Sequence, residues 1–115
     1  MDSDSTDPRM TLTTQIVLRA LLEDPARELY GLEICSRAGL PSGTIHPILA
    51  RLERIEWLES RWEDVDPSEQ GRPRRRYYRL SPDGAEQARS ALSRVEESTA
   101  ALRRLRPGLA FGGAV

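Results

Sequence analysis

Two short apolar repeats with helical period flank the tripeptide at 39–41, and this arrangement limits the possible folds more than any other feature of the sequence. The first repeat can begin at Gly31, and Gly39 stands where a helix commonly ends in a left-handed residue. The inward positions of this helix are Ile34, Cys35 and Ala38. The sequence therefore predicts a helix of about two turns, a tight turn, and then a second helix.

The second repeat predicts an amphipathic helix. Apolar residues follow Ile45 at offsets of 3, 4, 7 and 10, namely Ile48, Leu49, Leu52 and Ile55. The opposite face carries Thr44, His46, Pro47, Arg51 and Arg54. If Thr44 is the N-cap, Pro47 is the third helical residue and costs no hydrogen bond. If Ser42 is the cap, one backbone hydrogen bond is lost.

Further elements flank this pair. A first helix is predicted from Thr13, with Thr13 or Thr14 as its N-cap and an end at 24–25. Its inward residues are Ile16, Val17, Ala20 and Leu21.

Apolar and polar residues alternate at 57–62 and 76–80, which predicts the two strands of a hairpin. In these strands we expect Leu58, Trp62, Tyr78 and Leu80 to face the core, although exposed aromatics can also stack on bases. The long loop at 63–75 is expected to project as a wing.

Ser81 and Pro82 predict the start of a final helix, which runs to about residue 106. Its apolar and small residues follow a 3-4-3-4-3 spacing that a partner helix would naturally cover. We call these residues the C-terminal seam: Ala85, Ala88, Leu92, Val95, Thr99 and Leu102.

The order helix, helix, helix, strand, loop, strand, long helix indicates a mainly α protein with a small β-hairpin (α+β). This is the layout of a winged helix-turn-helix with a C-terminal dimerisation helix. The expected division is a disordered N-terminus at 1–10, the winged domain at 11–80, the dimerisation helix at 81–106 and a flexible tail at 107–115.

The composition excludes several classes of function. Cys35 and His46 are the only residues of their types, so an internal disulfide and a Cys/His zinc site are excluded. No glycine-rich phosphate loop and no nucleophile–histidine pair occurs, so we expect neither an enzyme nor a cofactor. No apolar run approaches the roughly 20 residues that span a bilayer. Residues 1–7 do not look like a secretion signal, and we expect a cytoplasmic protein without membrane contact.

The formal net charge of −1 conceals an uneven distribution. Five arginines lie within residues 72–79, directly after a run of acids at 63–69. A recognition helix with small, polar or cationic residues, followed by a basic wing, favours binding to double-stranded DNA. Two alternatives stay open: the exposed helix face is merely solvated, or the basic wing docks an acidic protein partner.

Three stretches together resemble PadR-family transcriptional regulators. They are the segment 30–34 with Tyr30 and Gly31, the segment 43–53 with its Gly-Thr-Ile-His-Pro opening, and the segment 71–84 with its Gly-Arg start and Tyr-Tyr strand. The resemblance implies a homodimeric repressor that binds an inverted repeat, with C-terminal helices crossing between subunits. His46 stands where the family usually has tyrosine.

The resemblance also implies site residues by position. Tyr30 is expected at a phosphate, and the wing tip is expected to be built by Gly71, Arg72 and Arg74, with Arg75 nearby. The groove-facing set is Ser42, Gly43, Thr44, His46, Pro47 and Arg51. Some relatives sense small aromatic compounds, which in this chain would stack on Trp57 or Trp62.

Overall fold

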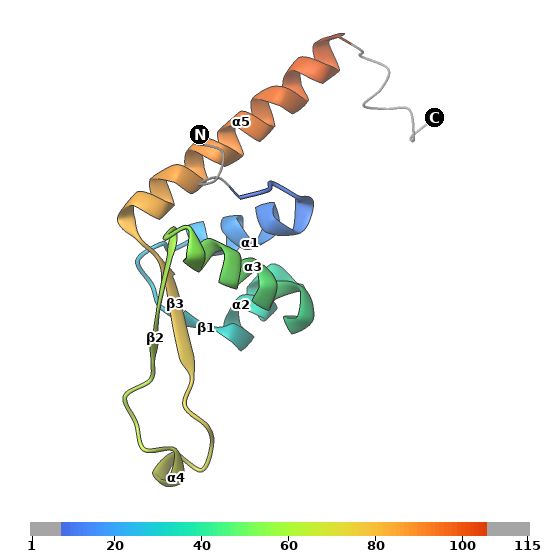
Figure 1. The fold of residues 1–115 in the computed structure, drawn as a ribbon. Coiled ribbons are helices and arrows are strands. Elements are labelled where there is room, and N and C mark those ends of the chain that lie inside the picture. The colour runs from blue at the N-terminus through green and yellow to red at the C-terminus, as the bar shows by residue number, and fades with distance from the viewer. Residues whose placement is uncertain (1–7, 106–115) are drawn as a thin grey trace.

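A computed structural model of the chain describes residues 8–105 (Figure 1). Three helices come first: α1 (Leu12–Leu22), α2 (Gly31–Ala38) and α3 (Ser42–Arg54), with the short strand β1 (Leu29–Tyr30) directly before α2. Strands β2 (Leu58–Trp62) and β3 (Arg76–Leu80) follow, separated by the small helix α4 (Pro67–Gln70). The long helix α5 (Pro82–Leu105) comes last. The predicted class, mainly α with a small sheet, is confirmed.

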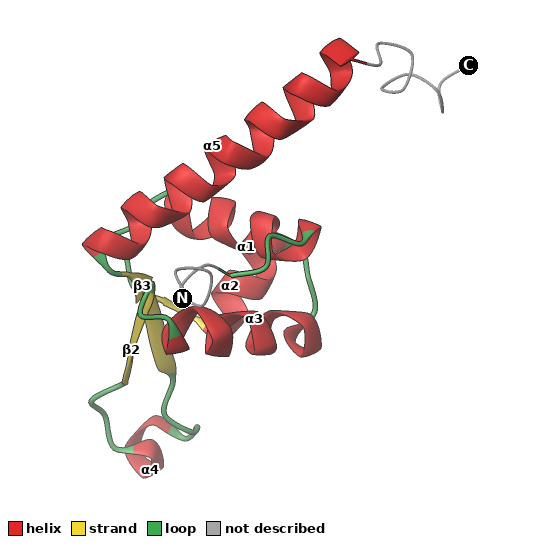
Figure 2. Ribbon diagram, turned by 45° about the horizontal axis from the view of Figure 1, so that its top comes forward, coloured by secondary structure: helices red, strands yellow, loops and turns green. Residues whose placement is uncertain are grey.

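The sheet has three antiparallel strands in the order β1-β3-β2. Tyr78 of β3 lies opposite Ser60 of β2 and also opposite Leu29 of β1. The predicted hairpin is therefore present, and the two-residue strand β1 adds a third strand to it. We call β2, β3 and the loop between them, residues 58–80, the wing. It extends away from the helices with α4 at its tip (Figure 2).

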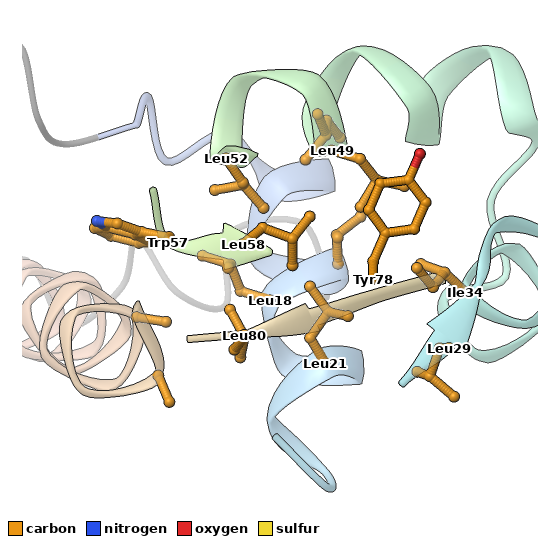
Figure 3. Packing of buried hydrophobic residues seen from close by; sticks show 14 of the residues in the cluster. Leu18, Leu21, Leu29, Ile34, Leu49, Leu52, Trp57, Leu58, Tyr78 and Leu80 are labelled. Atoms are coloured by element: carbon orange, nitrogen blue, oxygen red, sulfur yellow. The ribbon is translucent and has the colours of Figure 1, made fainter. Parts of the chain in front are cut away.

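One core joins the helices to the sheet (Figure 3). The helices contribute Leu18, Ile34, Leu49 and Leu52, and the strands contribute Leu58 and Tyr78 from the same face. Burial of each such large side chain stabilises the fold by about 1.5–3 kcal/mol relative to exposure. Because all three first helices contact this core, the position of α3 relative to the sheet is fixed by packing.

Trp62 does not belong to this core, and the predicted inward position is wrong. Its side chain lies on the same strand face as Leu58, but it is 58% exposed. The alternation of the strand is regular, whereas the helices cover only its first part, so the outer end of that face meets solvent.

Two helix starts differ from the prediction. Thr11 caps α1, and its hydroxyl accepts a hydrogen bond from the Thr14 backbone N–H at 3.2 Å, so neither Thr13 nor Thr14 is the cap. Pro41 precedes α3 as its N-cap residue, and Ser42 is already helical. Pro47 is therefore the sixth residue of α3, where it removes one backbone hydrogen bond in the exposed part of the helix.

The predicted disorder at 1–10 is wrong for residues 8–10. Met10 packs partly against the core, and its carbonyl accepts a hydrogen bond from Gln15 Nε2 at 3.0 Å. Residues 1–7, the predicted tail at 107–115 and the expected helix end at Arg106 lie outside the described residues.

The start of α5 is fixed as predicted, and its first turn is bound to the turn between α3 and β2. The Ser81 hydroxyl accepts a hydrogen bond from the Gly84 N–H at 2.9 Å and donates to the Glu56 carbonyl oxygen at 3.1 Å. A Cβ on Gly84 would lie only 2.1 Å from the Trp57 carbonyl oxygen. Only glycine permits this close contact between α5 and the backbone before β2.

The C-terminal seam divides into two parts. Ala85, Ala88 and Leu92 are buried in the core of their own chain, so their assignment to dimerisation is corrected to the core. Beyond them α5 leaves the body of the protein (Figure 1), where Val95 is half-buried and Thr99 and Leu102 are exposed. The sequence spacing is the same in both parts, because the same stripe first meets the chain's own core and then runs past it.

Candidate nucleic-acid interface

Helix α3 presents a polar face away from the core. Ile45, Ile48, Leu49 and Leu52 are buried, which turns the alternate positions outward. Arg51 and Arg54 take part in no ion pair among residues 8–105. The exposed side chains and backbone of this face belong to Ser42, Gly43, His46, Pro47, Arg51 and Arg54, while Thr44 is half-buried.

The first turn of α2 lies beside this face. A Cβ on Gly31 would lie 3.2 Å from Cε1 of His46, so a glycine at the start of α2 lets the imidazole approach closely. This contact places the exposed His46 ring between the two helices of the helix-turn-helix.

Tyr30 is held at the junction of the sheet and α2. Its N–H donates to Glu33 Oε1 at 3.1 Å, and its ring meets the Tyr77 ring edge to face, with centroids 5.9 Å apart. The guanidinium carbon of Arg75 lies 4.2 Å from the Tyr30 ring centroid. Two of the predicted site residues, Tyr30 and Arg75, are thus brought together by a cation–π contact.

The base of the wing loop is closed by an ion pair. Arg72 donates to both carboxylate oxygens of Glu63, and the Arg75 backbone N–H donates to the same carboxylate at 3.1 Å. These donors lower the pKa of Glu63 to about 2, and the same pair raises the pKa of Arg72. Gly71, with φ of 69°, supplies the left-handed residue that ends α4 just before this pair.

The wing arginines therefore fall into two groups. Three of them pair with carboxylates: Arg72 with Glu63, Arg76 with Glu53 and Arg79 with Glu59. Arg74 donates through Nε to the Val65 carbonyl oxygen at 2.8 Å and is exposed, and Arg75 stacks on Tyr30. Within the described residues, Arg74 and Arg75 are the wing arginines between 72 and 79 that no carboxylate neutralises.

Glu53 connects α3 to the wing, a link that the sequence analysis did not identify. Its carboxylate accepts hydrogen bonds from the Ser60 hydroxyl and from Arg76 Nη2, the latter at 3.3 Å. Glu53 lies in the last turn of α3, whereas Ser60 lies in β2 and Arg76 in the neighbouring strand β3. The spacing between the exposed helix face and the wing is thereby set by polar bonds as well as by packing.

The two tryptophans differ in what they offer a ligand. Trp57 is 3% exposed and fills the core, so its ring is not free to stack on an aromatic compound. It borders an open hollow of about 540 Å³ that also carries Glu56, Glu59 and Asp83. Among residues 8–105, no group of three or more histidine, cysteine or acidic side chains is placed to hold a metal ion.

A helix-turn-helix with an exposed second helix, followed by a projecting β-hairpin and a long helix, defines the winged helix-turn-helix class. The model of the transcriptional regulator PadR-like family matches residues 17–90, and the chain belongs to this family. No curated protein matches the sequence significantly. In the part of the chain that the structure describes, no helix is long and apolar enough to cross a membrane.

Solved structures share the fold at low sequence identity. A PadR family transcription regulator from Clostridium difficile is 19% identical, with a TM-score of 0.63 over 83% of this chain and 98% of that one. BpsR from Bordetella bronchiseptica, whose DNA binding is regulated by 6-hydroxynicotinic acid, is 18% identical. The TM-score is 0.63 over 87% of this chain and 71% of BpsR. A mutant of ZitR from Lactococcus lactis is 16% identical, with a TM-score of 0.58 over 91% of this chain, which spans 65% of ZitR.

Proposed function

We propose that the chain is a cytoplasmic, sequence-specific regulator that binds double-stranded DNA as a homodimer and represses transcription from an inverted repeat. The observation that carries the proposal is the exposed face of α3, with its unpaired Arg51 and Arg54, beside a wing that exposes Arg74. A helix of this width fits the major groove of B-DNA, where base edges can be distinguished.

The residues divide into base-reading and positioning roles. Thr44, His46 and Arg51 reach base edges, while Ser42, Gly43 and Pro47 let the start of α3 approach the groove. Tyr30 contacts a phosphate beside them. In the wing, Arg74 and Arg75 bind the backbone, and Arg72 supports them through Glu63 instead of contacting DNA directly.

The outer half of α5 supports the dimer. Val95, Thr99 and Leu102 continue the spacing of the buried stripe, and Leu102 is 55% exposed among residues 8–105. A second copy of the same helix covers such a stripe with a two-fold interface. Two recognition helices then meet DNA half-sites about 10 base pairs apart.

Selection from a pool of random duplexes by the purified full chain, at low and high salt, tests this function. An enriched inverted repeat that persists at high salt is the expected result. Binding that is purely salt-dependent and enriches no sequence would contradict specific recognition, and it would favour an interaction module whose wing binds an acidic partner.

A further inference from the structure

Trp62 is the tryptophan that this fold leaves at the surface. It ends β2 opposite Arg76 of β3 and is 58% exposed, whereas Trp57 is 3% exposed. A single exposed apolar side chain is common in proteins and is no evidence of a site by itself. Two further features distinguish Trp62: the shape and charge of its surroundings, and the way its ring is held.

The indole borders an open hollow of about 450 Å³ in the wing. The other lining residues are Pro67, Pro73 and Arg74, so the hollow combines apolar walls with one cation and contains no carboxylate. Both prolines have a fixed φ, which limits how far the walls can move. Arg74 uses Nε for the Val65 carbonyl oxygen, and its terminal nitrogens keep further donors. These features suit a ligand that joins an apolar ring to an anion.

The Trp62 ring is also connected to α3 through the side chain of Arg76. The guanidinium carbon of Arg76 lies 5.0 Å from the Trp62 ring centroid, and Arg76 in turn bonds Glu53 in the last turn of α3. Ser60, two residues before Trp62 and on the same strand face, donates to the same carboxylate. Trp62 therefore lies on the same strand face as Ser60, farther out along the wing.

We propose that the Trp62 hollow binds one deoxyribose-phosphate unit of the duplex that α3 engages, an inference that rests on the proposed function. The sugar packs on Trp62 and Pro73, and the phosphate pairs with Arg74. Bases in a duplex are stacked and paired, whereas sugars and phosphates line its outside and meet a wing first. A guanidinium matches the geometry of phosphate, and an indole offers a flat apolar surface to the sugar.

Tryptophan fluorescence tests the proposal directly, because the chain has two tryptophans. In the Trp57→Phe variant of the full chain, the signal comes from Trp62 alone. Acrylamide quenching is measured for the free protein and for its complex with a fluorescein-labelled duplex, and anisotropy shows how much complex has formed. We expect DNA to reduce the quenching constant severalfold. Trp62→Phe is the matched control, and its buried Trp57 should be quenched weakly with or without DNA.

An unchanged quenching constant in a complex that anisotropy shows to be saturated would overturn the Trp62 contact and leave DNA binding intact. Absence of any anisotropy change would overturn the proposed function and the contact with it. Affinity provides the second measurement: Trp62→Ala should weaken all duplexes alike by about tenfold, the loss of about 1.4 kcal/mol of apolar contact, and Trp62→Phe should retain most of the affinity. Equal affinity of wild type and Trp62→Ala would also overturn the contact.

Discussion

Arg72 and Glu63 face each other across the base of the wing loop with two parallel hydrogen bonds, Nη1 to Oε1 at 2.8 Å and Nη2 to Oε2 at 3.0 Å. The side chain of Glu63 is 13% exposed and that of Arg72 is 30% exposed, so the carboxylate is the more shielded partner. An arginine in this arrangement is neutralised before any ligand arrives. The cationic surface of the wing therefore depends on Arg74 and Arg75, which stand next to the pair in sequence.

The first prediction concerns the pH dependence of this pair. The pKa of Glu63 is lowered from 4.5 to about 2, first by the Arg72 hydrogen bond. A lowered carboxylate pKa in the folded state stabilises the fold above the ordinary value, and this contribution is lost as the pH falls from about 4.5 to about 2. An NMR titration of the Glu63 side-chain carbon should show a midpoint near pH 2. A midpoint near 4.5 would mean that the pair is open in solution.

The second prediction concerns Arg74, which we assign to a phosphate. Arg74→Ala should weaken binding to all duplexes similarly and reduce the slope of log affinity against log salt by about one unit. Arg103→Ala, an exposed arginine in the last turn of α5, is the matched control and should leave the slope unchanged. If both variants keep the wild-type slope, Arg74 does not contact phosphate.

The third prediction uses two glycines in helices. A Cβ on Gly84 would collide with the Trp57 backbone, whereas one on Gly43 would meet nothing within 4 Å. Gly84→Ala should lower the free energy of unfolding by about 1–3 kcal/mol or more, and Gly43→Ala should raise it by up to about 1 kcal/mol. Urea denaturation measures both. Equal stability of the two variants would show that α5 does not pack this closely on Trp57.

The fourth prediction concerns the dimer. Leu102→Glu places a charge in the outer part of the C-terminal seam and should raise the dimer dissociation constant at least about tenfold, which sedimentation measures. Ser93→Glu adds the same charge on the opposite face of α5, and we expect it to stay dimeric. A Leu102→Glu variant that sediments as a wild-type dimer would place the interface elsewhere.

Periodic elements could be predicted from the sequence, and their ends could not. The inward face of α3 has a period that Ile45, Ile48, Leu49 and Leu52 repeat often enough to identify. β1 has two residues, which is too short for any period, and it exists because Tyr30 and Leu29 pair with β3. The start of α3 depends on the backbone conformation of one residue, Pro41, and no pattern in the sequence marks it.

The sequence predicted which residues the candidate interface contains, but it did not predict which of its arginines form ion pairs. Sequence analysis identified the arginine-rich wing, but it could not show that Glu53 and Glu63 hold two of these arginines. Glu53 lies in α3, outside the wing, and Glu63 meets Arg72 only because the wing loop closes at its base. Trp62 follows the predicted strand alternation, and it is exposed because the wing carries the outer end of β2 past the helices. The C-terminal seam likewise has one spacing and two environments. In each case the burial or pairing of the side chain depends on how far the neighbouring elements extend in the fold, which a local sequence pattern does not contain.

Specific recognition by α3 is the central claim, and the affinity of Arg51→Ala for the selected duplex and for a scrambled one tests it most directly. Arg51 is exposed and unpaired among the described residues, so its removal should leave the fold intact. We predict that the variant loses about 1–3 kcal/mol of preference for the selected sequence while its binding to the scrambled duplex changes little. Thr44→Ala should act in the same direction. An equal loss of affinity on both duplexes, or none on either, would contradict base reading by α3.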